Sequence, residues 1–543
     1  MTVQPGELFP LDRALRGIRE RFADCVIDAD RTSLRERTVV VPAERLAEVS
    51  GAIVGEWGGL LLTLFALDER EAHGRFRLHV MFSMAPEDAF LTLVSAVPEL
   101  APAYRAVTTT VPAAHWLERE MQDLMGVTLM HHPDPRPLVA HDGWPRDFFP
   151  LRKDFAPPPD FGRTLASGDP LLAPRYRFLP VGGEGVFEIP VGPIHAGVIE
   201  PGHFRFSTVG EAVVKLDARL GFKWRGLEKL AEGATLSRGL ELAERLCGTC
   251  AFSHALAFCQ AAEELTGVVP PPRARALRSM AGELERLVNH LGDCSGILTD
   301  VAWVVGAAEF ARLKETVQQA VDALFGHRFL RGICVPGGVQ RDLDDAQQLW
   351  LRRVLADVRA DAADVLRAAH ANAAVMDRLV TTGTLTPAVA RDFGVTGVAA
   401  RASGLARDGR KDHPYAFYRE LDFSIVTREG GDVLARLEVR GDEIVESLNL
   451  VDQMILRLPG GPLVQHVGEP PPGRWGFGLV ESPRGLASHW LRVDERGLVG
   501  EWRVRSASHA IWPALAMTVP GNIVPDFPLI NKSFNLCYAC TDK

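Results

Sequence analysis

The sequence predicts an α+β N-terminal domain followed by a mainly α-helical domain. Three observations predict this fold class. Strand-like and helix-like segments alternate over residues 1–155, prolines cluster at 157–159, and long segments beyond them carry apolar residues at steps of three and four. Because a proline run neither continues a helix nor donates to a sheet ladder, we expect a Gly/Pro-rich linker at 156–184. The second domain is then expected to cover 185–543.

The N-terminal pattern begins with a strand-like segment at 38–41 and a segment of helical spacing at 43–54. Residues 60–66 and 76–84 resemble strands. A helical stretch at 86–97 is expected to close this α+β unit.

The second domain opens the helical part of the chain. Residues 276–291 predict a helix with one buried face, on which lie Leu277, Met280, Leu284, Leu287, Val288 and Leu291. Glu283 and Arg286 are expected outside that face. Residues 349–366 repeat the pattern, as in a helix bundle. The last stretch, 477–543, has shorter periods and is expected to be rich in loops.

Composition excludes several classes of protein. The chain has 543 residues, 47% of them hydrophobic and 24% charged, with a formal net charge of −9. This acidity argues against a nucleic-acid-binding protein, which usually carries a basic face. No apolar stretch approaches the roughly 18 residues of a membrane span, and the N-terminus lacks the pattern of a secretory signal. A soluble, cytoplasmic, multidomain protein is therefore expected.

Eight cysteines raise the functional question, and four of them form two Cys-x-x-Cys pairs: Cys247 with Cys250, and Cys537 with Cys540. In a reducing compartment such pairs indicate metal or redox chemistry. A zinc ribbon spaces its pairs by roughly 15–20 residues, whereas here the gap is 537 − 250 = 287 positions. A thioredoxin-like site would leave one pair unexplained. The other cysteines are expected to be buried packing residues: Cys25, Cys259, Cys294 and Cys334.

The residues around both pairs carry a resemblance. The stretch 244–250, Glu-Arg-Leu-Cys-Gly-Thr-Cys, resembles the first metal motif of nickel–iron hydrogenase large subunits, and 537–540 resembles the second, C-terminal motif. The resemblance is to membrane-bound group 4 enzymes of the formate hydrogenlyase type. Supporting segments lie at 200–205, 225–233, 337–342, 401–404, 412–414, 459–462 and 483–485.

The N-terminal unit resembles a different subunit. Glu118-Arg119-Glu120, with 123–126, 132–134 and 151–155, is similar to the 30-kDa subunit of respiratory complex I. The resemblance thus implies a 30-kDa-like domain fused to a mainly α-helical domain that is like hydrogenase large subunits and the complex I 49-kDa subunit. Complex I relatives share the fold but lack the four thiolates, which this chain keeps.

Four thiolates form a soft donor set suited to nickel and iron. By resemblance, Cys247 and Cys537 are terminal nickel ligands, and Cys250 and Cys540 bridge nickel to an iron that carries CN and CO. Cys537 also takes the proton when hydrogen is split.

Three further residues are expected to act at the site, two of them by the resemblance, and each has a plainer alternative. Glu200 matches the proton-gate glutamate, and is otherwise a surface residue beside a Pro-Gly turn. Arg484 matches the arginine that reaches over the cluster, and is otherwise a loop arginine in an ion pair. His254 is expected to bond a bridging sulfur and tune it, or else to be a packing residue.

Two departures from the family pattern stand out. The family usually has Asp-Pro before the second pair, where this chain has Asn535-Leu536. Its last motif residue is usually His or Arg, and here it is Lys543. A magnesium-like site that uses the terminal histidine in some relatives is therefore not expected.

The function implied is that of a hydrogenase catalytic subunit that interconverts H2 with protons and electrons. Its implied partners are an iron–sulfur small subunit like the complex I 20-kDa subunit, ferredoxin-like subunits and membrane-arm subunits. The expected location is peripheral, on the cytoplasmic side of the inner (plasma) membrane. The alternatives are a metal-free NADH-quinone oxidoreductase C/D-type subunit that contacts quinone, and a structural zinc protein.

Overall fold

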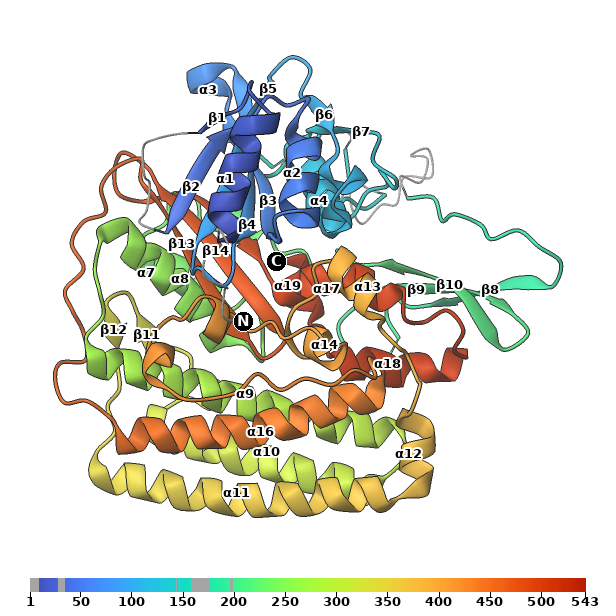
Figure 1. Cartoon of the computed structure of the whole chain (residues 1–543), viewed down its shortest axis with the longest axis vertical. Helices are drawn as coiled ribbons and strands as arrows, with labels where there is room; N and C mark the ends of the chain where they lie inside the picture. Colours follow the sequence, from blue (N-terminus) through green and yellow to red (C-terminus); the bar gives the residue numbers. More distant parts are fainter. Residues whose placement is uncertain (1–8, 28–34, 143, 146, 158–175, 196–198) are drawn as a thin grey trace.

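A computed structural model describes residues 9–27, 35–142, 144–145, 147–157, 176–195 and 199–543 (Figure 1). The N-terminal domain lies at one end of the molecule and a layer of long helices at the other (Figure 1). Most of the predicted linker lies outside the described residues, so the linker stays a prediction. None of the helices within the described ranges combines the length and apolarity that a membrane span requires.

The N-terminal domain is built on a mixed sheet of strand order β1-β2-β5-β4-β3, in which β2 and β5 run parallel and the other neighbours antiparallel. The strands are β1 (Val26–Ile27), β2 (Glu36–Val40), β3 (Leu60–Glu69), β4 (Arg75–Ser83) and β5 (Phe90–Pro98). The accompanying helices are α1 (Pro10–Arg21), α2 (Leu46–Gly55) and α4 (His115–Met125). An α+β domain is therefore confirmed, with its strands at 38–41, 60–66 and 76–84 and its helix at 43–54.

The helix predicted at 86–97 is wrong, because most of that segment forms strand β5. β5 pairs with β2 on one side and with β4 on the other. Leu91 and Leu93 are fully buried in the core. The spacing of apolar residues in this segment is compatible with a helix. The strand forms instead because its backbone groups are paired with a neighbouring strand on each side, and buried backbone groups must be paired.

Long helices form the body of the second domain: α8 (Ala251–Thr266), α9 (Pro272–Asp300), α10 (Val304–Phe325), α11 (Asp345–Ala371) and α16 (Val433–Leu456). The helices predicted at 276–291 and 349–366 are confirmed inside α9 and α11. Glu283 and Arg286 were expected outside the buried face of α9, but both are buried. They lie in an ion-pair network that the apolar pattern of α9 could not reveal.

The second domain also contains sheets, so the chain as a whole is mixed α/β, although helices form the larger part of this domain. One sheet holds β8 (Val186–Val191), β9 (His203–Val209) and β10 (Ala212–Arg219). A second three-stranded sheet holds β13 (Trp475–Ser482), β14 (Gly485–Val493) and β15 (Val499–Arg505). The stretch 477–543 is thus not rich in loops, and after β15 it forms α17 (Ala507–Ala516), α18 (Phe527–Phe534) and α19 (Tyr538–Asp542).

Shorter elements connect these parts. They are α3 (Arg70–His73), β6 (Ala103–Arg105), β7 (Thr128–Met130), α6 (Leu227–Leu230), α7 (Leu236–Ala243), β11 (Cys334–Val335), β12 (Gly338–Val339), α12 (Ala373–Leu379), α13 (Pro387–Asp392), α14 (Gly397–Ala402) and α15 (Gly409–Asp412).

Helix α8 lies unusually close to β13. A Cβ atom at Gly478 would lie 1.9 Å from the carbonyl oxygen of Ala257, and one at Gly476 would lie 2.2 Å from that of Ala261. Only glycine permits this approach of helix and strand backbones. The contact fixes the position of α8, whose first turn follows directly after Cys250.

The two domains pack sheet against sheet. Phe65 and Phe90 of the N-terminal sheet form an apolar cluster with Phe477 and Trp490 of β13 and β14. The rings of Phe65 and Trp490 lie 5.1 Å apart between centroids. Buried aromatic area of this kind gives a stable interface, so the N-terminal domain is docked firmly on the second domain.

Candidate metal centre

The four cysteines of the two pairs converge although 287 positions separate the pairs. The sulfurs of Cys247 and Cys250 lie 2.9 Å apart, and those of Cys247 and Cys537 lie 3.5 Å apart. The sulfurs of Cys247, Cys537 and Cys540 all lie within 4.8 Å of one another, a spacing that fits a shared metal ion. The four side chains form one sulfur cluster, of which Cys537 is the most exposed member.

Local structure at each pair turns the sulfurs inward. Cys250 is the N-cap of α8, and its backbone N–H lies 3.3 Å from the sulfur of Cys247. Cys537 is the N-cap of α19, and its sulfur accepts the backbone N–H of Cys540 at 3.4 Å. Each turn thus offers one backbone N–H to a sulfur of its pair, and such a contact favours negative charge on that sulfur.

The sulfurs share charge unequally. The pKa of Cys247 lies well below its ordinary value because hydrogen bonds with Cys250, Cys537 and Cys540 favour its thiolate. The same hydrogen bonds and burial raise the pKa of Cys250 and Cys540. Burial of several thiolates is costly without a cation, and a soft metal ion supplies the charge that offsets this cost. The donor set therefore fits the nickel and iron that the sequence implied.

Arg484 lies in the turn between β13 and β14 and reaches the sulfur cluster. One terminal nitrogen donates to the sulfur of Cys250 at 3.0 Å and to the side-chain oxygen of Asn289 at 3.1 Å. Its Nε donates to the carbonyl of Asn535. The side chain is buried, and its partners are a sulfur and two neutral oxygens rather than a surface carboxylate. An ordinary loop ion pair is therefore the weaker interpretation.

Glu200 contacts the second pair rather than standing free on the surface. Its Oε2 accepts the backbone N–H of Ala539 at 2.7 Å, between Cys537 and Cys540. The side chain is half-buried. Glu200, Arg484 and Cys537 all line a cavity of about 510 Å³ that leads from the sulfur cluster.

His254 is buried one turn into α8, and its Nδ1 lies 3.0 Å from Nε2 of His489. Burial lowers the pKa of His254 to about 4, so the ring is neutral near pH 7. Within the described ranges, no hydrogen bond between His254 and a cysteine sulfur is found. The ring of His254 therefore bonds His489 through Nδ1, rather than a cysteine sulfur as the sequence predicted.

Two residues that hold the cysteine segments were not singled out from the sequence. The guanidinium of Arg225 donates to the carbonyl of Leu246 at 3.0 Å and to that of Ala539 at 2.8 Å, and so joins the two segments. Glu285 accepts the N–H groups of Phe252 at 2.8 Å and Ser253 at 3.0 Å, which caps the start of α8. Arg225 could have been found from the sequence, because it is the first residue of the family-like segment 225–233. Glu285 lies within α9, and no sequence pattern there distinguishes it from other polar residues of the helix.

The departure at Asn535 has a local explanation. Asn535 adopts a left-handed backbone with φ of 49°, which asparagine tolerates better than most residues. Its amide donates to Asp293, whose carboxylate also pairs with Arg440 at 2.9 Å. An aspartate at 535 would face the carboxylate of Asp293. The side-chain amide of Asn535 avoids this repulsion and donates a hydrogen bond to Asp293 instead.

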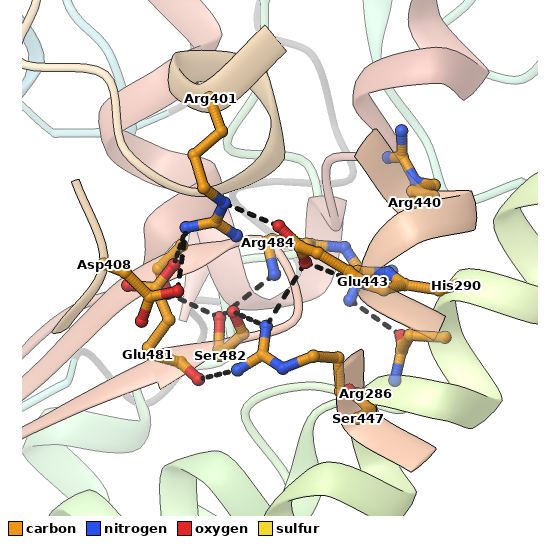
Figure 2. A network of polar contacts seen from close by, with 12 residues as sticks. Arg286, His290, Arg401, Asp408, Arg440, Glu443, Ser447, Glu481, Ser482 and Arg484 are labelled. Carbon is orange, nitrogen blue, oxygen red and sulfur yellow. Dashed lines mark hydrogen bonds and ion pairs between the residues drawn. The ribbon is translucent and has the colours of Figure 1, made fainter. Parts of the chain in front are cut away.

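A buried ion-pair network supports the turn that carries Arg484 (Figure 2). Arg401 pairs with Glu443 at 2.6 Å and with Glu481 at 2.8 Å, while Arg286 donates to the carbonyl of Glu481 at 2.7 Å. Glu443 also accepts from His290 at 2.7 Å. Buried charges persist only when paired, so the network restricts the end of β13 and with it the turn.

The remaining cysteines lie apart from the sulfur cluster. Cys259, Cys294 and Cys334 are fully buried in the core of the second domain, and Cys25 is half-buried in the N-terminal domain. Burial of the first three agrees with the expected packing role, whereas Cys25 was expected to be buried and is only partly so.

Comparison with known proteins identifies the relatives of this architecture. Residues 39–160 match the family of the respiratory-chain NADH dehydrogenase 30 Kd subunit, residues 225–292 match nickel-dependent hydrogenases, and residues 300–474 match the respiratory-chain NADH dehydrogenase 49 Kd subunit.

Individual relatives cover nearly the whole chain. Formate hydrogenlyase subunit 5 of Escherichia coli is 35% identical over 97% of this chain and 93% of its own length. Hydrogenase-4 component G of the same organism is 33% identical over 97% of this chain and 92% of its own length. A C/D-type NADH-quinone oxidoreductase protein of Phocaeicola vulgatus is 30% identical over 73% of this chain and 78% of its own length.

Among solved structures, a chain of the membrane-bound sulfane sulfur reductase, an archaeal respiratory membrane complex, superposes with a TM-score of 0.63 at 28% identity. The match covers 67% of this chain and all of that one. Of these relatives, the two from Escherichia coli match over the longest span of this chain. The chain belongs to the nickel–iron hydrogenase large subunits of the formate hydrogenlyase type, with fused complex I 30-kDa-like and 49-kDa-like domains.

Proposed function

We propose that this chain is the catalytic large subunit of a complex I-related nickel–iron hydrogenase, and that it interconverts H2 with protons and electrons. The observation that carries the proposal is the convergence of four cysteine sulfurs from two segments 287 positions apart, under the guanidinium of Arg484. Packing alone does not require thiols here, whereas a soft bimetallic centre does.

The ligand assignment follows the resemblance. Cys247 and Cys537 would hold nickel as terminal ligands, and Cys250 and Cys540 would also contact an iron that carries CN and CO. When bound, the two metals would supply a vacant coordination position and an acceptor for the electron pair that H2 gives up on heterolytic cleavage. Metal binding would release the thiol protons, so assembly of the centre depends on pH.

The chain's own residues move the proton. The sulfur of Cys537, the most exposed of the four, takes the proton produced by cleavage. Glu200 and Cys537 line the same cavity, and Glu200 is bonded to the backbone of α19 between the second pair. A carboxylate in this position can take the proton from the sulfur and release it towards solvent.

Arg484 contributes a positive charge next to the sulfur cluster. Its guanidinium is fixed by Cys250, Asn289 and Asn535, and so cannot swing away from the cluster. A fixed cation beside a thiolate stabilises negative charge that accumulates on the ligands. His254 is also proposed to tune the bridging sulfur of Cys250 from beside the first pair, with its ring held in place by His489.

Electrons must leave through a partner, because the eight cysteines include no further motif for an iron–sulfur cluster. We propose an iron–sulfur small subunit like the complex I 20-kDa subunit, with ferredoxin-like and membrane-arm subunits beyond it. The structural match belongs to an archaeal respiratory membrane complex, which supports association with a membrane complex. We further propose a peripheral position on the cytoplasmic side of the inner (plasma) membrane. We also propose that the 30-kDa-like domain covers residues 1–155 and that the hydrogenase-like domain covers residues 185–543.

The test is metal analysis of the purified complex. One nickel per chain, with infrared bands from metal-bound CN and CO, is the expected result. Nickel and iron at trace levels only, in a complex that is folded and reduces quinone, would instead support the C/D-type alternative that the Phocaeicola relative represents. One zinc per chain with neither of the other metals would support the structural zinc protein.

A further inference from the structure

Lys543 follows Cys540 by three residues, and its side chain is buried at a junction of both domains. Its ammonium donates to Oε2 of Glu120 at 2.8 Å, to Oε1 of Glu228 at 3.3 Å and to the carbonyl oxygen of Val504 at 2.8 Å. Glu120 lies on α4 of the N-terminal domain, while Glu228 and Val504 belong to the second domain. The end of the cysteine-bearing segment is therefore attached to both domains.

The three acceptors match the chemistry of the group they hold. An ammonium has three N–H donors, and each of them finds an oxygen here. Only 4% of Lys543 is exposed, and a lysine is buried to this extent only when it is paired. Burial alone would lower the pKa of Lys543, but Glu120 and Glu228 together hold it above its ordinary value. The group is thus a fixed cation.

The backbone transmits this attachment to the second cysteine pair. The N–H of Lys543 donates to the carbonyl of Ala539 at 3.0 Å, so the residue continues the turn of α19 that carries Cys540. Arg225 donates its backbone N–H to the carbonyl of Lys543 at 2.7 Å. Asp542 accepts the N–H groups of Gly221 and Lys223 at 2.9 and 2.8 Å. Displacement of the ammonium would move a segment of only five helical residues.

The N-terminal partner is itself rigid. Two neighbours of Glu120 on α4 are buried carboxylates with several donors each. Glu118 accepts from Tyr104, Val107 and Thr108, and Asp123 accepts the N–H groups of residues 138–140. Helix α4 therefore presents Glu120 to Lys543 from a fixed position.

We propose that Glu120 is a positioning residue for the second cysteine pair and acts on it through Lys543. The N-terminal domain then contributes to the geometry of the metal centre, although it holds none of the ligands. The consequence for metal binding rests on the proposed function, whereas the contact between Glu120 and the C-terminal segment does not.

The test uses the full chain purified without added nickel and compares Glu120→Met, Lys543→Met and their double variant. Both substitutions keep an unbranched side chain, equal in length to glutamate and one atom shorter than lysine, and each removes one member of the contact. Amide hydrogen exchange of residues 537–543 is expected to accelerate by about tenfold or more in each single variant, with little further change in the double variant. Alkylation of Cys537 is expected to accelerate as well.

Two further variants keep the result specific. Lys543→Arg retains the cation and is expected to keep exchange within about threefold of the wild type. Asp88→Asn weakens a different interdomain contact, with Arg419 and His413, and is expected to leave residues 537–543 unchanged. Unchanged exchange in Glu120→Met with a folded N-terminal domain would overturn the proposal, as would equal acceleration in Asp88→Asn.

The metal readout is separate. Chains matured with nickel are expected to contain less nickel in Glu120→Met than in Asp88→Asn. If the wild type itself binds no nickel, the proposed function fails, while the exchange results still decide the role of Glu120.

Discussion

The two cysteine pairs are held in different ways. Cys247 and Cys250 precede a 16-residue helix that is buried along most of its length and packs directly on β13 through Gly476 and Gly478. Cys537 and Cys540 belong to a five-residue helix that is held by polar contacts from both domains. The first pair takes its position chiefly from the apolar core around α8, with Glu285 capping that helix. The second takes its position chiefly from hydrogen bonds and ion pairs that exist only once the rest of the chain is folded.

Removal of a sulfur from the second pair should have the largest effect. Cys537→Ser is expected to reduce hydrogen turnover below detection and to lower the nickel content, because a hydroxyl is a poor ligand for a soft metal. The measurements are hydrogen turnover and nickel per chain. Cys334→Ala is the control, since that buried sulfur only packs, and it should keep activity. Full nickel and turnover in Cys537→Ser would refute the ligand assignment.

Arg484 connects the two pairs, since it contacts Cys250 and the residue two positions before Cys537. Arg484→Lys keeps the charge but loses the planar fork, and should lower the rate of hydrogen turnover by roughly 10²-fold. Nickel content should stay unchanged. Arg492→Lys, which alters a more exposed pair with Glu501, is the matched control. Equal rates in both variants would show that the fork is not needed.

Glu285, which caps the helix of the first pair, should make stability depend on pH. Burial raises the pKa of Glu285 to about 7. The folded chain therefore holds this proton more tightly than the unfolded chain. The stability contributed is full below about pH 4.5 and is lost as the pH rises to about 7. Urea unfolding of Glu285→Gln should lack this loss, a difference of roughly 1–3 kcal/mol. Parallel pH profiles for the two chains would contradict this.

Loss of the single hydrogen bond between Tyr538, next to Cys537, and Asn531 should have the smallest effect on stability. Tyr538→Phe removes the hydroxyl that accepts from Asn531 at 3.1 Å, and should lower the free energy of unfolding by about 1 kcal/mol. Urea unfolding measures this. A loss above about 3 kcal/mol would mean that the second pair is as deeply embedded as the first.

Much of the site followed from the sequence because the residues that carry it lie in short motifs. Both Cys-x-x-Cys pairs, Glu200 and Arg484 could be singled out in that way. Glu285 could not, because it meets α8 from a separate helix and its spacing on α9 is that of any polar residue. The partner of His254 was also missed, since His489 lies 235 positions away.

The fold shows the same division. Apolar steps of three and four predicted α9 and α11 correctly, because a helix face is encoded within one segment. They failed at β5, where pairing with β2 and β4 decided the conformation. They also failed to show that Glu283 and Arg286 are buried, because their partners come from other elements.

By itself, the sequence determined that four thiols in two pairs were available to bind a soft metal, since donor chemistry and local spacing are properties of short segments. The tertiary structure decided that the two pairs meet and that Arg225 and Arg484 join them. It also decided that Glu120 of the N-terminal domain contacts Lys543, which follows the second pair. The reason is that most of these contacts join residues more than 200 positions apart, and only the packing of sheets and helices brings such residues within hydrogen-bond distance.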